Sequence, residues 1–306
     1  MKFLRRLIAA PAILLTPPVA AQTAPVPAAA PAVAPATVDA DPALWVVKDK
    51  DTTIYLFGTI HVLKPGLSWF DEAVKTAFDK SDSLVLEMVQ PDPESMKGLV
   101  ISKGFTQSGP TLTEQLPEAE RPVYTKALTD LGVPPAAFDR ARPWLVATNL
   151  SLLPLVKGGY AADAGPEQVL TAAAGTEKKP VIGLETPEQQ IGYLADMPDA
   201  LQLKFLEATL KDLPTASEDM AEMVDAWSHG QPDKLAAIMN ESMKETPELG
   251  KILLTDRNVR WAQWIKQRLA TPGTVFIAVG AGHLAGNGSV QDQLGKLGIK
   301  ATRIAY

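Results

Sequence analysis

The segment Thr53-Ile54-Tyr55-Leu56-Phe57-Gly58-Thr59-Ile60-His61 predicts a β-strand that delivers a histidine at its carboxyl end. β-Branched and aromatic residues favour strands, and the glycine allows close approach of backbone or ligand. The segment Thr274-Val275-Phe276-Ile277-Ala278-Val279-Gly280-Ala281-Gly282-His283 repeats this arrangement near the other end of the chain. Each strand ends in Gly-x-x-His, and together they hold two of the three histidines. Ligands of open α/β sheets bind outside the carboxyl ends of the strands, so we expect both motifs to form one site.

The first motif opens a predicted βαβ unit. A helix is expected over residues 68–78 with Ser68 as its N-cap, followed by a strand over residues 83–89. We expect this strand to pair in parallel with the strand that ends at His61, which places both carboxyl ends on one edge of the sheet. A hairpin is expected just before them, between residues 44–48 and 52–57.

The rest of the chain is predicted to be mostly helical. Prolines divide residues 117–174 into short helical pieces, and a brief strand over residues 179–186 ends in Glu185-Thr186. Further helices are expected over residues 187–194, 198–210, 217–229, 232–243, 249–269 and 289–297, and an edge strand over 300–305. The predicted fold class is α/β, with a central mixed sheet, βαβ units and a large helical insertion at residues 117–210. We expect one domain over residues 41–306.

Composition narrows the classes of function. The chain has 306 residues, a net charge of −6 and no stripe of basic residues, which argues against a nucleic-acid partner. It has no cysteine, which excludes disulfides, thiol catalysis and thiolate metal sites.

The amino terminus predicts export. Lys2, Arg5 and Arg6 precede an apolar run over residues 7–15, and small residues at 19–21 suit a cleavage site, so residues 1–21 are predicted to be a signal peptide. The run is shorter than the ~20 residues of a membrane span, although an uncleaved amphipathic anchor is an alternative. Residues 22–40, rich in alanine and proline, are predicted to be an extended linker. We expect a periplasmic or secreted protein with no transmembrane segment after cleavage.

Two glutamates are candidates for chemistry. Glu87 interrupts the apolar strand Leu84-Val85-Leu86-Glu87-Met88-Val89, and a carboxylate buried there costs several kcal/mol unless it is paired or bound to a metal. The alternative is an outward-facing position, because strand side chains alternate. Glu185 repeats this pattern, and its alternative is an acid in the first turn of the helix that starts near Pro187.

Two histidines with one or two carboxylates at strand ends are a ligand set for Zn²⁺, Mn²⁺ or Co²⁺. His61, His283 and Glu87 are therefore the candidate metal ligands. Arg257 and Asn258 open a long amphipathic helix, where arginine could bind a carboxylate or stabilise an oxyanion, or only join a surface ion network. His229 lies at a predicted helix end and is interpreted as structural.

Several common active sites are excluded by their missing motifs. The chain has no Gly-x-Ser-x-Gly, no phosphate-binding Gly-x-x-x-x-Gly-Lys-Ser/Thr and no His-Glu-x-x-His. The glycines at 280, 282 and 286 have the wrong spacing for a dinucleotide fingerprint.

The ordered motifs Leu-Phe-Gly-Thr-Ile-His-Val, Leu-Val-Leu-Glu, Gly-Leu-Glu-Thr-Pro-Glu-Gln-Gln, Asp-Arg-Asn-x-x-Trp and Val-Gly-Ala-Gly-His-Leu-x-Gly resemble the TraB/GumN family, which includes the TIKI Wnt-cleaving proteases. The resemblance covers residues 45–306. It implies a TIKI-like fold related to the erythromycin-esterase and ChaN type. For the TIKI members it implies an Mn²⁺- or Co²⁺-dependent metalloprotease that uses both Gly-x-x-His motifs and a glutamate. Matched by motif, these are His61, His283 and Glu87, with Glu185 and Arg257-Asn258 as further motif positions.

Three functions are compatible with these residues. The first is a metal-dependent hydrolase of peptide bonds, with His61 and His283 as ligands, Glu87 as third ligand or general base, and Arg257 at the oxyanion. The second is a non-catalytic envelope protein that binds a peptide, glycan or haem-like ligand, and the third is a metal-independent, esterase-like hydrolase. In each, a peptide or small molecule enters the cleft. The expected substrate-binding residues are Glu185, Asn258, Gly58, Gly280 and Gly282.

Overall fold

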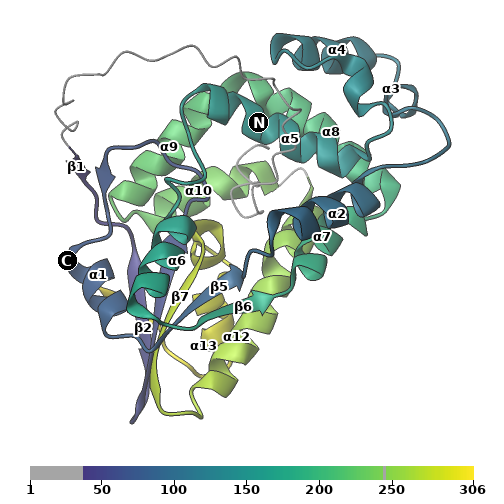
Figure 1. Ribbon diagram of the computed structural model, residues 1–306. Coiled ribbons are helices and arrows are strands. Elements are labelled where there is room, and N and C mark those ends of the chain that lie inside the picture. The colour runs from purple at the N-terminus through teal and green to yellow at the C-terminus, as the bar shows by residue number, and fades with distance from the viewer. Residues whose placement is uncertain (1–36, 244–245) are drawn as a thin grey trace.

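A six-stranded mixed sheet forms the centre of the fold in a computed structural model, which describes residues 37–243 and 246–306 (Figure 1). Its strand order is β6-β5-β7-β3-β2-β8. The strands β3, β5, β6 and β7 run parallel, whereas β2 is antiparallel to both of its neighbours. Their bounds are β2 Leu44–Lys48, β3 Thr52–Thr59, β5 Ser83–Met88, β6 Val181–Glu185, β7 Gly273–Gly280 and β8 Thr302–Ile304. The α/β class, the mixed sheet and the β2–β3 hairpin are confirmed.

The late strand β7 lies between the two early strands. It pairs with β3, where Thr59 faces Gly280, and with β5, where Ser83 faces Val275. The parallel direction of β3 and β5 is therefore as predicted, but their direct pairing is wrong. The physical reason is that β7 is buried from Val275 to Gly280, so it needs a hydrogen-bonded strand at each edge and cover on both faces.

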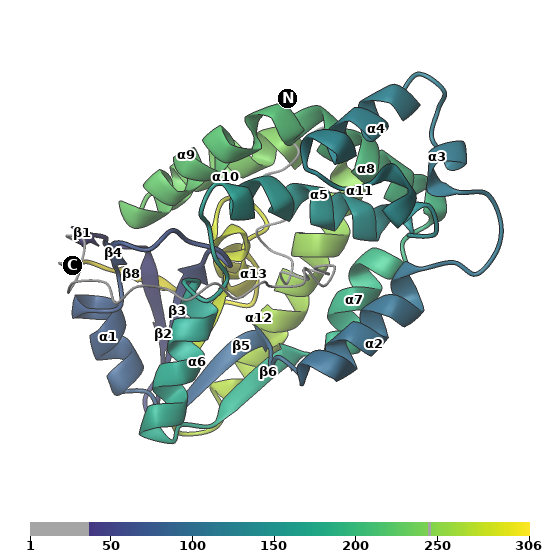
Figure 2. The same cartoon turned by 45° about the horizontal axis from the view of Figure 1, so that its top comes forward.

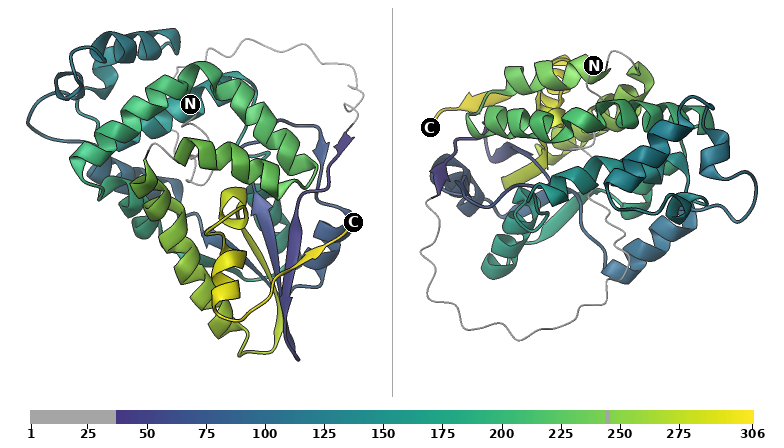
Figure 3. Two further views of the ribbon diagram at one scale, coloured as in Figure 1. Left: turned by 180° about the vertical axis from the view of Figure 1, so that it is seen from behind. Right: turned by 90° about the horizontal axis from the view of Figure 1, so that it is seen from above.

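Helices cover both faces of the sheet. Figures 1 and 3 show α12 and α13 on one face and α1 and α6 on the other. Side chains alternate accordingly, since Leu56 and Ile277 join the apolar cluster under α12 and α13, while Phe57 and Phe276 join the opposite cluster. The bounds are α1 Glu72–Asp79, α6 Pro166–Glu177, α12 Asp256–Arg268 and α13 Val290–Lys296.

The helical insertion has its own apolar cluster. Helix α5 packs against α8, and α2 packs against α7 (Figure 2). Helices α9 and α10 lie over the ends of β3 and β7, where Trp227 Nε1 donates to the carbonyl of Gly58. The bounds are α2 Pro93–Gly104, α3 Leu112–Gln115, α4 Arg121–Asp130, η2 Pro135–Phe138, α5 Pro143–Lys157, α7 Pro187–Ala195, α8 Asp199–Asp212, η3 Leu213–Thr215, α9 Ala216–Ser228 and α10 Pro232–Met243. The prediction had no helix at α2, although Asp92 caps it and Pro93 starts it.

Two predicted boundaries are corrected near the start of the domain. Strand β1 (Val38–Asp39) pairs with β4 (Leu67–Ser68), and Ala40 is buried, so residues just before the predicted start at 41 also pack into the fold. Ser68 is not the N-cap of α1, because it lies in β4 and Asp71 holds the cap position. The signal peptide and most of the linker, residues 1–36, lie outside the described residues, and export stays a prediction.

The helix predicted over residues 249–269 consists of three consecutive pieces. These are α11 (Pro247–Gly250), a π-helical turn η4 (Lys251–Thr255) and α12. The π turn lies directly before Arg257, and such turns often occur at functional sites. Within residues 37–243 and 246–306, no helix is both long and apolar enough to cross a bilayer.

Candidate functional site

The carboxyl ends of the parallel strands bring most of the predicted site residues together. Glu87 is near the end of β5, Glu185 ends β6, and His283 lies in η5 (Ala281–Leu284), directly after β7. His61 follows β3 by two residues. The four residues come from segments far apart in the sequence, and the parallel arrangement places their strand ends on one edge.

Arg257 of α12 connects these ends. Its Nη2 donates to Glu87 Oε2 and to Glu185 Oε2, the latter at 2.7 Å, and its Nε donates to Glu185 Oε1 at 3.0 Å. Its Nη1 donates to the Leu253 carbonyl and to His283 Nε2, both at 3.2 Å. Arg257 is 2% exposed, Glu87 7% and Glu185 6%, so this is a buried ion cluster rather than a surface network. The positive charge of Arg257 offsets the cost of burying the carboxylates.

Neutral donors complete the hydrogen bonding of the two carboxylates. Gln190 Nε2 donates to Glu87 Oε2 at 3.2 Å and to Glu185 Oε2 at 3.0 Å. The backbone N–H of Gly280 donates to Glu87 Oε1 at 2.8 Å. Tyr193 Oη and Trp261 Nε1 donate to Glu185 Oε1 at 3.1 and 3.2 Å. Hydrogen bonds from several directions therefore fix the orientation of each carboxylate.

His283 is fully buried and is held by both ring nitrogens. Arg257 can only donate, so Nε2 must accept, and we infer that the proton is on Nδ1, which donates to Asn258 Oδ1 at 2.5 Å. Asn258 Nδ2 in turn donates to the Gly288 carbonyl. Burial, the charge of Arg257 and that of His61 lower the pKa of His283 well below its ordinary value. The ring is therefore neutral and fixed in one tautomer.

His61 belongs to a second ion pair. Its Nδ1 lies 2.5 Å from Glu167 Oε1, and Thr59 Oγ1 donates to the same oxygen at 2.5 Å. Burial lowers the pKa of His61, but the charge of Glu167 and its hydrogen bond outweigh burial, so the pKa is raised. Within the described part of the chain, Nε2 of His61 is buried and has no hydrogen-bond partner.

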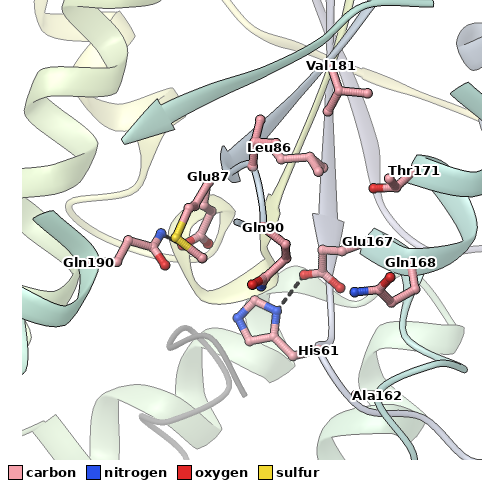
Figure 4. Close-up of a pocket in the computed structure, with 12 residues that line it drawn as sticks. His61, Leu86, Glu87, Gln90, Ala162, Glu167, Gln168, Thr171, Val181 and Gln190 are labelled. Carbon is pink, nitrogen blue, oxygen red and sulfur yellow. Dashed lines mark hydrogen bonds and ion pairs between the residues drawn. The ribbon is translucent and has the colours of Figure 1, made fainter. Parts of the chain in front are cut away.

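A pocket of about 320 Å³ lies in front of these groups. Its lining includes His61, Glu87, Glu167 and three glutamines, Gln90, Gln168 and Gln190 (Figure 4). Val181 of the edge strand β6 lines it as well. The pocket thus places polar donors and acceptors near the His61 ring, whose Nε2 has no partner among the described residues.

The three predicted substrate-binding glycines have structural contacts in this structure. Gly58 and Gly282 lie in tightly packed surroundings, and Gly280 donates a hydrogen bond. A Cβ on Gly58 would lie 3.0 Å from the Cα of Ala281, and one on Gly282 would overlap the side chain of Met239. Gly280 uses its N–H for Glu87. Their roles toward a substrate, like those of Glu185 and Asn258, stay predictions.

Comparison with known proteins identifies the family. The sequence profile of the TraB/PrgY/gumN family matches residues 43–303. The chain belongs to the TraB/PrgY/gumN family. The uncharacterized protein YbaP of Escherichia coli (strain K12) is 26% identical over 254 residues, which cover 83% of this chain and 92% of YbaP. YbaP of Shigella flexneri matches to the same extent. No solved structure matches the chain.

The metal implied by the resemblance to the TIKI proteases would be held by His61, Glu87 and His283. The lone pair of His283 Nε2 accepts from Arg257, and Glu87 accepts three hydrogen bonds, from Arg257, Gln190 and Gly280, so His283 has no free lone pair to offer an ion beside His61. Among the residues that the structure describes, no three His, Asp or Glu side chains form a group that could hold a metal. As arranged, the three residues do not fit a shared ion, and dependence on Mn²⁺, Co²⁺ or Zn²⁺ stays a prediction.

Glu167 and Gln190 are two of the site residues that the sequence analysis missed. Glu167 is in the first turn of α6, where acids are common, so nothing distinguishes it from a helix-starting residue. Gln190 belongs to the family motif Gly-Leu-Glu-Thr-Pro-Glu-Gln-Gln, and its burial could have been suspected from its place five residues after Glu185.

Proposed function

We propose that this member of the TraB/PrgY/gumN family is a hydrolase in which His61 is the acid–base group and a peptide is the substrate. The proposal is based on the hydrogen bonding of the two ring nitrogens of His61. Glu167 holds Nδ1, while Nε2 is buried at the pocket without a partner in the described residues. A carboxylate on one nitrogen orients an imidazole and leaves the other nitrogen to exchange a proton with a bound group.

The charge of Glu167 determines the direction of the pH dependence. Burial alone would lower the pKa of His61, but Glu167 raises it overall, which makes the neutral ring a stronger base. In the proposed reaction, neutral His61 removes a proton from the water that attacks the substrate carbonyl, and then returns it to the leaving amine. The rate should therefore rise with pH through the raised pKa of His61.

The edge strand β6 supports a peptide as the substrate. Val181 of β6 lines the pocket, and among the described strands only β5 pairs with β6, so its other edge has no strand beside it. An extended peptide can add to such an edge through main-chain hydrogen bonds, which aligns it along the protein. A peptide bound in this way would lie along β6, whose Val181 lines the pocket that also contains His61.

A role for metal is supported by the same ring, because metal-bound histidines commonly donate their second nitrogen to a carboxylate. The state of His283 does not support it, since the one lone pair of its Nε2 accepts from Arg257. We therefore propose the metal-independent reaction, which keeps Arg257 bound to its two glutamates rather than to an oxyanion.

The test is cleavage of a diverse peptide library by the purified protein, followed by mass spectrometry, with and without EDTA. We expect cleavage that persists in the chelator and falls by roughly 10²–10⁴ in His61→Asn, because a positioned base contributes about that factor. Glu167→Gln should also lower the rate and shift the pH profile to lower pH. His229→Asn is the matched control, because this histidine is exposed at the end of α9.

Three outcomes would contradict the proposal. Activity that is lost in EDTA and restored by Mn²⁺ or Co²⁺ would favour the metal-dependent hydrolase. Peptides that bind without being cleaved would favour the non-catalytic binding protein. Cleavage unchanged in His61→Asn would remove His61 from the reaction.

A further inference from the structure

Thr59, the last residue of β3, is hydrogen-bonded to the carboxylate that holds His61. Its Oγ1 donates to Glu167 Oε1 at 2.5 Å, and His61 Nδ1 lies 2.5 Å from the same oxygen. Figure 4 shows the pair of His61 and Glu167 at the pocket. Thr59 is fully buried, whereas the side chains of His61 and Glu167 are 14% and 22% exposed. Two donors on one oxygen restrict the rotation of this carboxylate beside the ring.

The second Gly-x-x-His motif has no counterpart of this hydroxyl. Ala281 stands there at the position that Thr59 holds in the first motif. Both ring nitrogens of His283 have partners on α12 instead. In the described part of the chain, Nε2 of His61 has no partner. The hydroxyl of Thr59 therefore belongs to the one motif whose histidine keeps a ring nitrogen available at the pocket.

The backbone fixes the distance between Glu167 and the ring. Helix α6 starts against the backbone of His61, because a Cβ on its N-cap Gly165 would overlap the carbonyl oxygen of His61 and lie 2.9 Å from the carbonyl carbon. Leu63 and Ala161 exchange two backbone hydrogen bonds, at 3.2 and 2.9 Å, which join the chain after His61 to the chain before α6. The rotation of the Glu167 carboxylate is the freedom that remains, and Thr59 restricts it.

We propose that Thr59 is a positioning residue, whose hydroxyl directs the Glu167 carboxylate at Nδ1 of His61 and so leaves Nε2 as the nitrogen that accepts a proton at the pocket. The hydrogen bond on one ring nitrogen decides which tautomer of a neutral histidine is present. Without the hydroxyl, the carboxylate can turn away, and the proton of the neutral ring is shared between Nδ1 and Nε2. The consequence for turnover rests on the proposed hydrolase, whereas the tautomer does not.

The test reads the tautomer of neutral His61 from the nitrogen NMR chemical shifts of its ring in isotope-labelled protein. The chain has only three histidines, so His61→Asn identifies the signals. We expect the proton on Nδ1 in wild type and a mixture of tautomers in Thr59→Val, which keeps the shape of threonine without its donor. Thr59→Ser keeps the hydroxyl and should retain the wild-type tautomer. Thr148→Val is the matched control, because Thr148 is equally buried and donates only within α5, to the Trp144 carbonyl.

Circular dichroism checks the fold of each variant, and Thr59→Ala removes the same hydroxyl as a second, independent variant. A wild-type tautomer in folded Thr59→Val or Thr59→Ala overturns the proposal, as does a wild-type ring with its proton on Nε2.

The same variants separate this inference from the proposed hydrolase. In peptide cleavage, Thr59→Val should lower kcat by roughly 10–100-fold, the factor that a hydrogen bond to a charged group is worth. KM should change little, since Thr59 is fully buried. Thr59→Ser should recover most of the loss. The tautomers are measured without a substrate, so a protein that cleaves no peptide would contradict the proposed hydrolase, while the tautomers would still decide the role of Thr59.

Discussion

At the scale of single residues, the pair formed by His61 and Glu167 makes the free energy of unfolding depend on pH. The pKa of His61 is raised above 6.5, because Glu167 outweighs burial. The contribution of protonated His61 to the free energy of unfolding is therefore complete below pH 6.5. It is lost as the pH rises through the folded-state pKa of His61. Burial raises the pKa of Glu167, but His61 and Thr59 lower it overall, below 4.5. The contribution of ionised Glu167 to the free energy of unfolding is present above pH 4.5. It is lost as the pH falls through the folded-state pKa of Glu167.

We therefore expect His61→Gln to lower the free energy of unfolding most between pH 4.5 and 6.5, where both members of the pair are charged in either state. The difference from wild type should shrink on both sides of this window. Urea unfolding at a series of pH values measures it, with His229→Gln as the control because that side chain is 64% exposed. A difference that is constant from pH 4 to 9 would show that the charge of the pair is unimportant.

The sequence predicted those site residues that break a local pattern. Glu87 stands out in an apolar strand, and His61 and His283 stand out at the ends of matching strands. Glu167 does not stand out, because an acid in the first turn of a helix is the ordinary expectation. The alternation argument that left Glu87 open as an outward-facing residue fails here, because helices cover both faces of β5 and bury every residue from Ser83 to Met88.

At the scale of elements, Arg257 joins α12 to the ends of β5 and β6 and to η5. Removing one partner of a buried ion pair leaves an uncompensated charge, which typically costs roughly 3–5 kcal/mol. We expect Arg257→Met to lower the free energy of unfolding by about this amount. Arg260→Met is the control, because Arg260 is half exposed on the same helix and contacts Tyr193, and an exposed contact of this kind is worth less than about 1 kcal/mol. Urea denaturation of both variants measures the difference, and equal losses would contradict the argument.

The close approach of β3 to η5 depends on Gly58. An added Cβ would lie 3.0 Å from the Cα and 3.1 Å from the Cβ of Ala281, which is tighter than backbone packing normally allows. We expect Gly58→Ala to destabilise the fold by about 1–3 kcal/mol, the usual cost of overpacking.

Gly98 provides the matched control for Gly58. It lies in α2 with no atom within 4 Å of an added Cβ, so Gly98→Ala should stabilise by about 0.5–1 kcal/mol through helix propensity. Thermal unfolding of both variants gives the comparison. A neutral Gly58→Ala with reduced peptide binding would instead return Gly58 to the predicted substrate-binding role.

Most helices and strands were predictable because each has a signal in its own sequence. Which strands lie side by side in the sheet was not predictable in this way. The β-branched and aromatic residues within 52–59 and 273–280 are local signals for strands, and the structure has β3 and β7 there. The place of β7 between β3 and β5 is not a property of any one strand. The position of β7 depends on how the apolar faces of all the strands and helices are covered, and this depends on the whole chain.

At the scale of the whole molecule, the sheet is completed only by the last part of the chain. The central strand β7 begins at Gly273, more than two hundred residues after its partner β3 begins at Thr52. Without β7, the strands β3 and β5 each lose their shared neighbour, and Glu87 loses the N–H of Gly280. The ends of the sequence thus depend on each other for the core as well as for the site, and such non-local pairing makes folding slow.

We therefore expect a chain that ends at residue 271 to lack a cooperative unfolding transition, although it keeps every helix of the insertion. The matched control ends at residue 298 and loses only β8, a three-residue edge strand that pairs with β2. That chain should unfold cooperatively with reduced stability, since an edge strand removes fewer hydrogen bonds and covers less apolar surface than a central one. Circular dichroism during urea titration, together with amide hydrogen exchange in β3 and β5, distinguishes the two. If the shorter chain protected the amides of β3 and β5 as the control does, the early strands would form a core of their own, and the two Gly-x-x-His motifs would not depend on one another through the sheet.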